Sequence, residues 1–440
     1  MKQNALLTPS ILSKVALLCL CLFAAMTSHA AQVPPSIYQR YQSLASQFAA
    51  INAQPEKTTS EDKTALLAEI SHFYQQQSTH SLARQLLGSN LYLPVLLQKQ
   101  QYQQAYQVVN TLLTQPLDEK QQLTFQQLAA QLSAQLKKTD GKESQIWALV
   151  EQHLTKWFAL VDQHNAEQLK SLGINKKQVA GNAALLAQAF YLQKKLTQAL
   201  PFAERAYQAF PKEKPYMTLV LALLQGLEKH QALNHYLKIA VVDFPQTADF
   251  WLRLAYSYLS LDNNKLALST LAITRNQGLL DKQGYNTLSA LYLQYQQPRL
   301  AVTVMQEGAA KQLLTKDEAY YQRLTNAWLM ARDRDNALRA IQAAKKAGFQ
   351  SEKQAQQQAQ LFYLQGQWAE AEVAYQALLN NITNKQQPQP KKQVLIHDKW
   401  RFLLAMSQLE QQKKQPAKAN LQKLQTKQYQ GYAKDWLAQL

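Results

Sequence analysis

Cysteine and glycine are scarce in this chain of 440 residues, and so are strand-forming patterns. The two cysteines, Cys19 and Cys21, both lie in an apolar run near the N-terminus, so the rest of the chain has no disulfide framework. The 11 glycines fit helices joined by short turns. Signatures of common hydrolases, zinc proteases and nucleotide-binding loops do not occur. The composition therefore argues against a small disulfide-rich scaffold and against the commonest enzyme families.

A hydrophobic pattern returns every 34 residues through the middle of the chain. In most copies, apolar or small residues follow a starting residue at +3, +4, +7 and +20, and a small residue usually stands at +16. This spacing predicts two short antiparallel helices that touch through the small residues. The copies begin at Ala183, Met217, Trp251, Tyr285, Tyr321 and Ala355, with a weaker one at Arg401. A chain built in this way is an all-α solenoid.

The repeated residues resemble the tetratricopeptide repeat (TPR), which has an aromatic, a leucine, a small residue, a second aromatic and an alanine in this order. The copy that begins at Trp251 supplies Leu254, Ala255, Tyr258 and Ala267. Pro211 and Pro245 stand where the two preceding copies end, and proline cannot continue a helix there. The resemblance implies a right-handed superhelix of antiparallel helix pairs.

The N-terminus has the features of a secretory signal. Lys2 and Lys14 precede an apolar run over residues 15–26, and Ser28, His29 and Ala30 form the small-x-small pattern that signal peptidase cuts. The run is too short for a comfortable membrane span. We therefore expect cleavage after Ala30 and export to the bacterial periplasm.

Repeat regularity divides the chain into five expected segments. They are a signal peptide at 1–30, a helical region with degenerate repeats at 31–180, the regular solenoid at 181–379, a polar loop at 380–397 and a degenerate closing repeat at 398–440.

The charge is strongly basic, with 47 Lys and Arg against 29 Asp and Glu. Such a balance favours anionic partners, which include nucleic acid, anionic envelope surfaces and acidic proteins. Export argues against nucleic acid. Pairs of lysines, such as Lys345 and Lys346, fall near expected helix ends, where they also interact favourably with the helix dipole.

A narrower resemblance covers residues 214–308 and extends more faintly along the chain. It rests on Asp243-Phe244-Pro245, on the run from Asp249 to Leu254, and on the closing Ala433-Lys434-Asp435-Trp436-Leu437. These residues are similar to those of periplasmic TPR proteins of gamma-proteobacteria that accompany a TonB energy-transduction system. The resemblance implies an accessory protein for TonB-dependent uptake, with TonB, ExbB or ExbD as partners, no catalytic residues and no cofactor.

Candidate partner-binding residues follow from the repeat frame. In TPR solenoids the first helix of each pair lines the concave side, with groove-facing positions at −2, +1, +5 and +8 from the starting residue. Polar side chains at these positions can hydrogen-bond an extended peptide, and a tyrosine adds contact area. The candidates are Asp249, Tyr256, Gln283, Asn286, Gln322 and Asn326, and simple solvation is their alternative role.

Candidates for catalysis or metal binding are weaker. Glu143 and Glu151 could pair on one helix face, but a solvated face explains them better. His230 and His235 are five residues apart, which does not place both on one face of a helix. Trp147 and Trp157 are better explained as buried residues between helices than as a glycan clamp. We expect no catalytic residues and no metal site.

The sequence thus predicts a non-enzymatic periplasmic scaffold that binds protein partners and acts as an accessory to a TonB system. One alternative is a scaffold for envelope assembly, peptidoglycan or cell-division complexes. Another is the solenoid part of a peptidoglycan-active enzyme, but the helical frame leaves no room for a compact catalytic domain.

Overall fold

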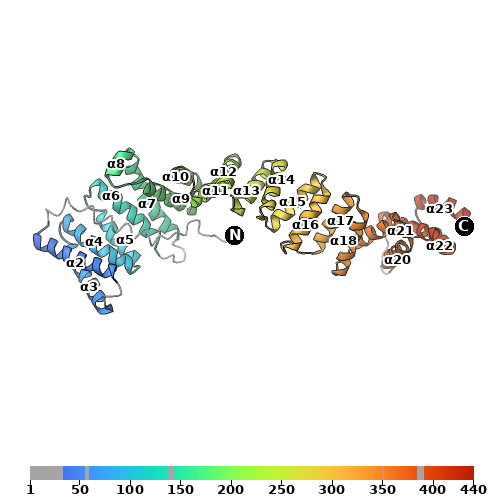
Figure 1. Cartoon of the computed structure of the whole chain (residues 1–440), viewed down its shortest axis with the longest axis horizontal. Coiled ribbons are helices and arrows are strands. Elements are labelled where there is room, and N and C mark those ends of the chain that lie inside the picture. The colour runs from blue at the N-terminus through green and yellow to red at the C-terminus, as the bar shows by residue number, and fades with distance from the viewer. Residues whose placement is uncertain (1–32, 55–58, 137–142, 350, 384–390) are drawn as a thin grey trace. The chain divides into compact units, whose positions relative to one another are not determined.

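The computed structural model describes the backbone of residues 33–54, 59–136, 143–349, 351–383 and 391–440. Within these ranges the chain forms α-helices joined by short turns, with no strand (Figure 1). The expected signal peptide and its cleavage site lie outside the described residues. The all-α fold class is confirmed, while the right-handed superhelix stays a prediction.

Two compact units divide the chain, Met1–Pro245 and Gln246–Leu440. Unit 1 holds α2 (Pro35–Ala53), α3 (Ser60–Gln77), α4 (Leu82–Gln98), α5 (Tyr102–Leu112), α6 (Glu119–Ser133), α7 (Glu143–Val161), α8 (Ala166–Ser171), α9 (Lys176–Leu192), α10 (Leu196–Ala209), α11 (Lys214–Gly226) and α12 (His230–Asp243). One apolar cluster joins α2, α3 and α4, and a second joins α4, α5 and α6. Trp157 of α7 is fully buried and packs edge-on against Phe158, as expected for a residue between helices.

Unit 2 holds α13 (Ala248–Ser260), α14 (Asn264–Asn276), α15 (Lys282–Gln294), α16 (Pro298–Ala310), α17 (Glu318–Met330), α18 (Arg334–Lys346), α19 (Glu352–Leu364), α20 (Trp368–Thr383), α21 (Lys391–Glu410), α22 (Lys414–Gln422) and α23 (Lys427–Gln439). The seven helices from α13 to α19 each have 13 residues. Each helix packs against the next one along the chain. This regular alternation is the architecture that the repeat spacing predicts.

Burial confirms the repeat frame at the small positions. Ala267, Ala301, Ala337 and Ala371, at +16 in four successive copies, are completely buried. An alanine at this point lets the two helices of a pair approach closely, and a larger side chain there would overpack the contact. The chain therefore has a TPR type of fold.

The turn inside each pair has a recurring backbone conformation. The second residue after the first helix is left-handed, with φ of 55° at Asp262 and Gln296, 57° at Arg332 and 72° at Gly366. The backbone N–H of the residue that follows this left-handed residue donates to a carbonyl in the last turn of the first helix. In the second copy of unit 2, Gln297 N–H donates to the carbonyl of Tyr292 at 2.7 Å. This is the Schellman arrangement that ends a helix and turns the chain sharply.

The expected polar loop at 380–397 is shorter than predicted. Helix α20 continues to Thr383 and α21 begins at Lys391, so only residues 384–390 separate them, and these lie outside the described residues. Two prolines and a run of polar residues suggested the longer loop. Helices tolerate polar residues on exposed faces, and residues 391–397 of this segment form the start of α21.

Candidate functional site

The six predicted groove residues lie on the first helices of three successive pairs. Asp249 and Tyr256 belong to α13, Gln283 and Asn286 to α15, and Gln322 and Asn326 to α17. Asp249, Gln283 and Asn326 are exposed, and the other three are partly buried. They occupy three positions of the repeat, each represented in two copies, and their role in binding stays a prediction.

Several of these side chains already have local contacts. Asp249 forms an ion pair with Arg253 one turn on, with 3.7 Å between Oδ2 and Nη1. Gln322 donates through Nε2 to Glu318 Oε1 at 3.0 Å. Burial raises the pKa of the Tyr256 hydroxyl, which is buried without a hydrogen-bond partner among the described residues. Asn286 Oδ1 is likewise buried without a partner among the described residues.

The structure shows a hollow in unit 2 that none of the six predicted groove residues lines. Its volume is about 920 Å³, and we call it the turn hollow because it lies beside the turn between α17 and α18. It is lined by Arg299 of α16, by Leu329, Ala331, Arg332, Asp333, Arg334 and Asp335 of the turn and its flanking helices, and by Gln357, Gln360, Leu361, Leu364 and Gln365 of α19 and its end. A smaller hollow of about 340 Å³ is lined by Gln297, Pro298, Arg299, Leu300 and Ala331. Arg299 and Ala331 line both hollows.

Local sequence explains how the turn hollow forms. Arg332 is left-handed, and the N–H groups of Arg332 and Asp333 donate to the carbonyls of Leu329 and Trp328, both at 3.0 Å. These bonds end α17 and reverse the chain. Asp333 then caps α18, accepting from the Asn336 backbone N–H at 3.0 Å. The short side chain of Ala331 leaves space beside this turn.

The acidic groups of the turn hollow are engaged in internal contacts. Hydrogen bonds from the backbone and side chain of Asn336, together with Arg299 and Arg339, lower the pKa of Asp333, so it stays ionised. Asp335 accepts from Gln365 Nε2 at 2.6 Å. Arg334 donates through Nη1 to the carbonyl of Leu364 at 3.2 Å. These contacts hold the start of α18 against the end of α19.

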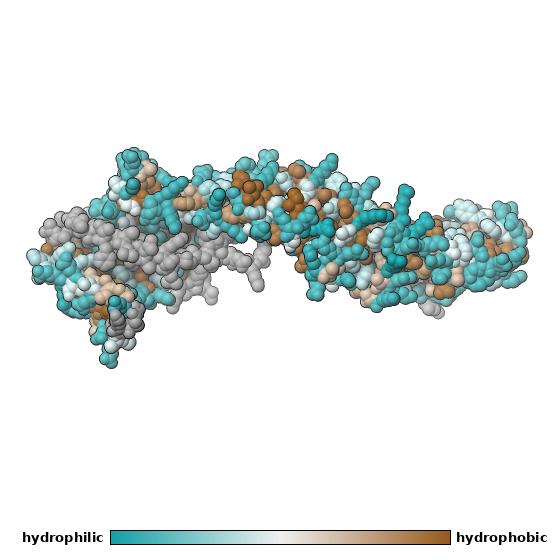
Figure 2. Space-filling model, in the orientation of Figure 1, coloured by the Kyte–Doolittle hydropathy of each residue, from teal (hydrophilic) through white to brown (hydrophobic). Residues whose placement is uncertain are grey.

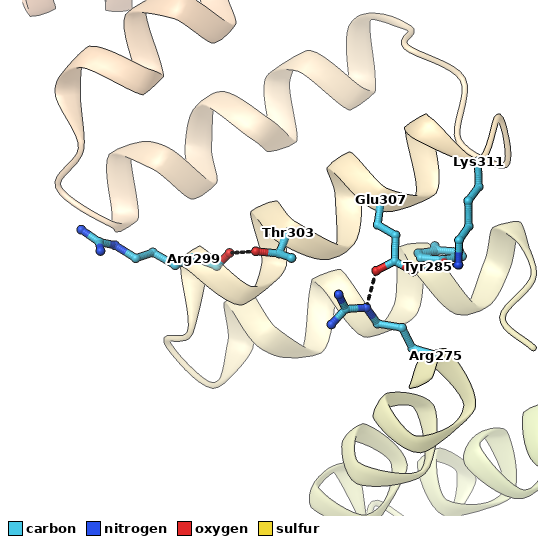
Figure 3. A network of polar contacts seen from close by, with 6 residues as sticks. All are labelled: Arg275, Tyr285, Arg299, Thr303, Glu307 and Lys311. Atoms are coloured by element: carbon cyan, nitrogen blue, oxygen red, sulfur yellow. Dashed lines mark hydrogen bonds and ion pairs between the residues drawn. The ribbon is translucent and has the colours of Figure 1, made fainter. Parts of the chain in front are cut away.

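Arg299 and Arg332 differ from the other charged residues of the turn hollow. Both are exposed, and neither forms an ion pair within the part of the chain that the structure describes. Figure 3 shows the guanidinium of Arg299 extending away from α16, while its backbone carbonyl accepts from the Thr303 hydroxyl at 3.0 Å. The face of unit 2 over α15 to α18 is largely hydrophilic (Figure 2). The turn hollow therefore offers two available cations on a polar surface.

A polar network stabilises the neighbouring repeats (Figure 3). Glu307 of α16 accepts from Arg275 Nε of α14 at 2.6 Å, from the Tyr285 hydroxyl of α15 at 2.7 Å and from Lys311 Nζ at 2.9 Å. Burial alone would raise the pKa of Glu307, but the hydrogen bonds from Lys311, Tyr285 and Arg275 outweigh it and lower the pKa to about 2. The network joins three helices and has a structural role.

The residues considered from the sequence for catalysis or ligand binding lie in ordinary structural contacts. Glu151 forms an ion pair with Lys195 at 2.6 Å, and the side chain of Glu143 lies outside the described part. Trp147 is buried between helices, as predicted. The described residues bring no three His, Cys, Asp or Glu side chains together in a way that could hold a metal ion. Over the same residues, no helix combines the length and the apolar character that crossing a membrane requires.

Sequence reasoning missed Arg299 and Arg332. The groove-facing position at +8 from Tyr321 is Leu329, which does line the turn hollow. A search for cations near the turn of each pair would have found both arginines. Their exposure could not be predicted from the sequence. It depends on the left-handed backbone at Arg332 and on the hydrogen bonds that the acidic residues of the turn form with other side chains.

No known family model matches the sequence, and no curated protein matches it. Among solved structures, a tetratricopeptide repeat protein from Parabacteroides merdae is 15% identical over 60% of this chain and 97% of its own, with a TM-score of 0.32. YrrB, described as a TPR protein with an unusual peptide-binding site, is 15% identical over 40% of this chain and 89% of its own, also with a TM-score of 0.32. PilF from Pseudomonas aeruginosa is 11% identical over 48% of this chain and 95% of its own, with a TM-score of 0.29. Likeness at this level does not bear on the partner of this chain.

Proposed function

We propose that this protein is a non-enzymatic periplasmic scaffold that binds protein partners, and that it is an accessory component of a TonB-dependent uptake system. The observation that supports a scaffold is the regular stack of helix pairs in unit 2, which presents polar side chains at equivalent positions of successive repeats. Such a surface suits an extended protein segment. The TonB assignment is supported by the sequence resemblance at Asp243-Phe244-Pro245 and the residues that follow.

Export is the first part of this proposal to test. Cleavage of the signal after Ala30 gives a mature protein that begins at Ala31. N-terminal sequencing of the protein from the periplasmic fraction of the native host is expected to read Ala31 first. An intact Met1, or a lipid-modified Cys21, would contradict export by this route.

Partner binding is tested with the predicted groove residues. The triple change of Asn286, Gln322 and Asn326 to alanine removes hydrogen-bonding groups from the first helices without changing the buried residues of the repeat. Each lost hydrogen bond costs about 0.5–1.5 kcal/mol, so affinity for the periplasmic domains of TonB or ExbD should fall about tenfold or more. Isothermal titration calorimetry measures this loss, and circular dichroism checks that the helices persist.

A matched control changes exposed amides of the second helices, Asn276, Gln306 and Gln342, to alanine. Its affinity is expected to equal that of the wild type. If the wild-type protein binds neither domain, the TonB assignment is wrong. If the two triple variants bind equally well, the partner uses another surface.

A further inference from the structure

We propose that the turn hollow and the smaller hollow beside it bind an extended acidic segment of a partner protein, with Arg299 and Arg332 pairing with its carboxylates. This inference rests on the proposed scaffold function and names the chemical class of the partner. The two hollows share Arg299 and Ala331, so they lie next to each other beside the turn between α17 and α18. The larger hollow alone, at about 920 Å³, falls in the size range of ligand pockets.

The two arginines are presented by the backbone. Arg332 occupies the left-handed position of a turn that two hydrogen bonds fix, so its Cα has little freedom. Arg299 stands in the first turn of α16, beside Pro298. Both are exposed, and neither forms an ion pair with a described residue. A guanidinium with free N–H donors matches the geometry of a carboxylate, which it can bind through two parallel hydrogen bonds.

Three arginines and two aspartates line the turn hollow, so its lining keeps an excess of positive charge. Asp333 accepts from both the backbone N–H and the side-chain amide of Asn336, at 3.0 and 2.9 Å. Asp335 accepts from Gln365. Each acid is thus oriented by an internal donor, and Arg334 is directed to the carbonyl of Leu364. Arg299 interacts electrostatically with Asp333, but neither Arg299 nor Arg332 forms an ion pair with a described residue, so both guanidinium groups can still pair with an incoming carboxylate.

The remaining lining favours a peptide over a compact anion. Leu300 and Leu364 are exposed by 44% and 46%, so each hollow offers an apolar contact near its arginine. Gln357 and Gln360 add amides that can donate to and accept from an extended backbone. A phosphate group would use the cations and the amide donors but not the apolar residues. An acidic residue flanked by apolar residues would use all three kinds of group.

The test uses the exported full-length protein and a fluorescein-labelled ten-residue peptide in which glutamates alternate with leucine and serine. Fluorescence anisotropy measures binding to the wild type, to Arg299→Ala/Arg332→Ala and to a control double variant, Lys265→Ala/Arg323→Ala. The control cations are exposed, lie in unit 2 and line neither hollow. Both double variants lose two positive charges, so long-range attraction falls equally in the two.

The wild type is expected to bind the peptide. The Arg299/Arg332 variant should weaken binding about tenfold or more, since hydrogen bonds to charged groups are the stronger class. The control variant should change binding less than about twofold. Equal weakening by the two variants, or no binding by the wild type, would overturn the proposal. Vesicles that contain phosphatidylglycerol supply the other anion, and loss of vesicle binding in the Arg299/Arg332 variant with peptide binding intact would overturn it too.

These results separate the hollow from the TonB assignment. If the arginines govern peptide binding but the TonB and ExbD domains do not bind, the partner is wrong and the acidic-peptide site stands. If those domains bind the wild type and the Arg299/Arg332 variant alike while the peptide does not bind, the site is wrong and the scaffold function stands.

Discussion

Replacing Glu307 with glutamine is expected to lower the free energy of unfolding by about 2 kcal/mol. The two carboxylate oxygens accept from donors on opposite sides, Arg275 at Oε2 and both Tyr285 and Lys311 at Oε1. Glutamine keeps one oxygen, so its amide N–H₂ must face one set of donors. The side chains of Glu307 and Arg275 are only 26% and 23% exposed, so water replaces the lost bonds incompletely. Urea unfolding of the full-length protein measures the change.

The same network has a defined dependence on pH. The pKa of Glu307 falls from an ordinary value of 4.5 to about 2 in the folded protein. A carboxylate with a lowered pKa stabilises the folded state fully above its unfolded pKa and loses this contribution as the pH falls towards its folded pKa. The stability difference between the wild type and Glu307→Gln should therefore stay constant from about pH 7 to pH 5 and shrink to about half near pH 3.

Glu410→Gln provides the matched control, because Glu410 is exposed. Its cost should stay below about 0.5 kcal/mol, as for most surface changes. A Glu307→Gln deficit that equals this control, or one that does not change between pH 5 and pH 3, would show that the network contributes little to stability.

The sequence allowed the repeat frame to be predicted because the closest contacts inside a helix pair are local and periodic. Ala267 and Ala301 stand where two backbones approach, and the period identifies them without knowledge of any distant residue. The Glu307 network was harder to predict from the sequence. Only its contact between Glu307 and Lys311 joins residues one helical turn apart, and the other donors are distant along the chain. Arg275 stands 32 residues before Glu307, close to one repeat. Pairs of opposite charge about one period apart are thus a signal that single-helix analysis overlooks.

The hollow at the turn could not be predicted from helix faces. Groove-facing positions follow from the direction of a side chain on a regular helix, and this reasoning reached Leu329. Arg332 lies beyond the end of α17 in a left-handed conformation, so helix geometry does not determine the direction of its side chain. The nearby acids, Asp333 and Asp335, accept hydrogen bonds from Asn336 and Gln365. The repeat period does not predict these contacts.

Replacing Asp398 with alanine is expected to detach the closing helix α23. Asp398 of α21 is only 1% exposed, and its Oδ2 accepts from the backbone N–H groups of Gln425 and Thr426, at 2.9 and 2.6 Å, and from the Thr426 hydroxyl at 2.8 Å. Thr426 is the N-cap residue of α23, so the carboxylate binds backbone N–H groups immediately before this helix begins. Alanine leaves three donors without an acceptor, at a cost of about 3 kcal/mol or more.

Hydrogen exchange followed by mass spectrometry distinguishes local detachment from general unfolding. In Asp398→Ala, peptides from α23 should lose protection, while peptides from α13 to α18 should exchange as in the wild type, because each repeat packs mainly on its neighbours. Asp435→Ala removes an exposed carboxylate from α23 itself and should leave exchange unchanged. Asp398→Asn keeps one oxygen and should retain part of the protection. If α23 stays protected in Asp398→Ala, the helix is held by its apolar contacts with Phe402 and Met406 of α21 rather than by the buried carboxylate.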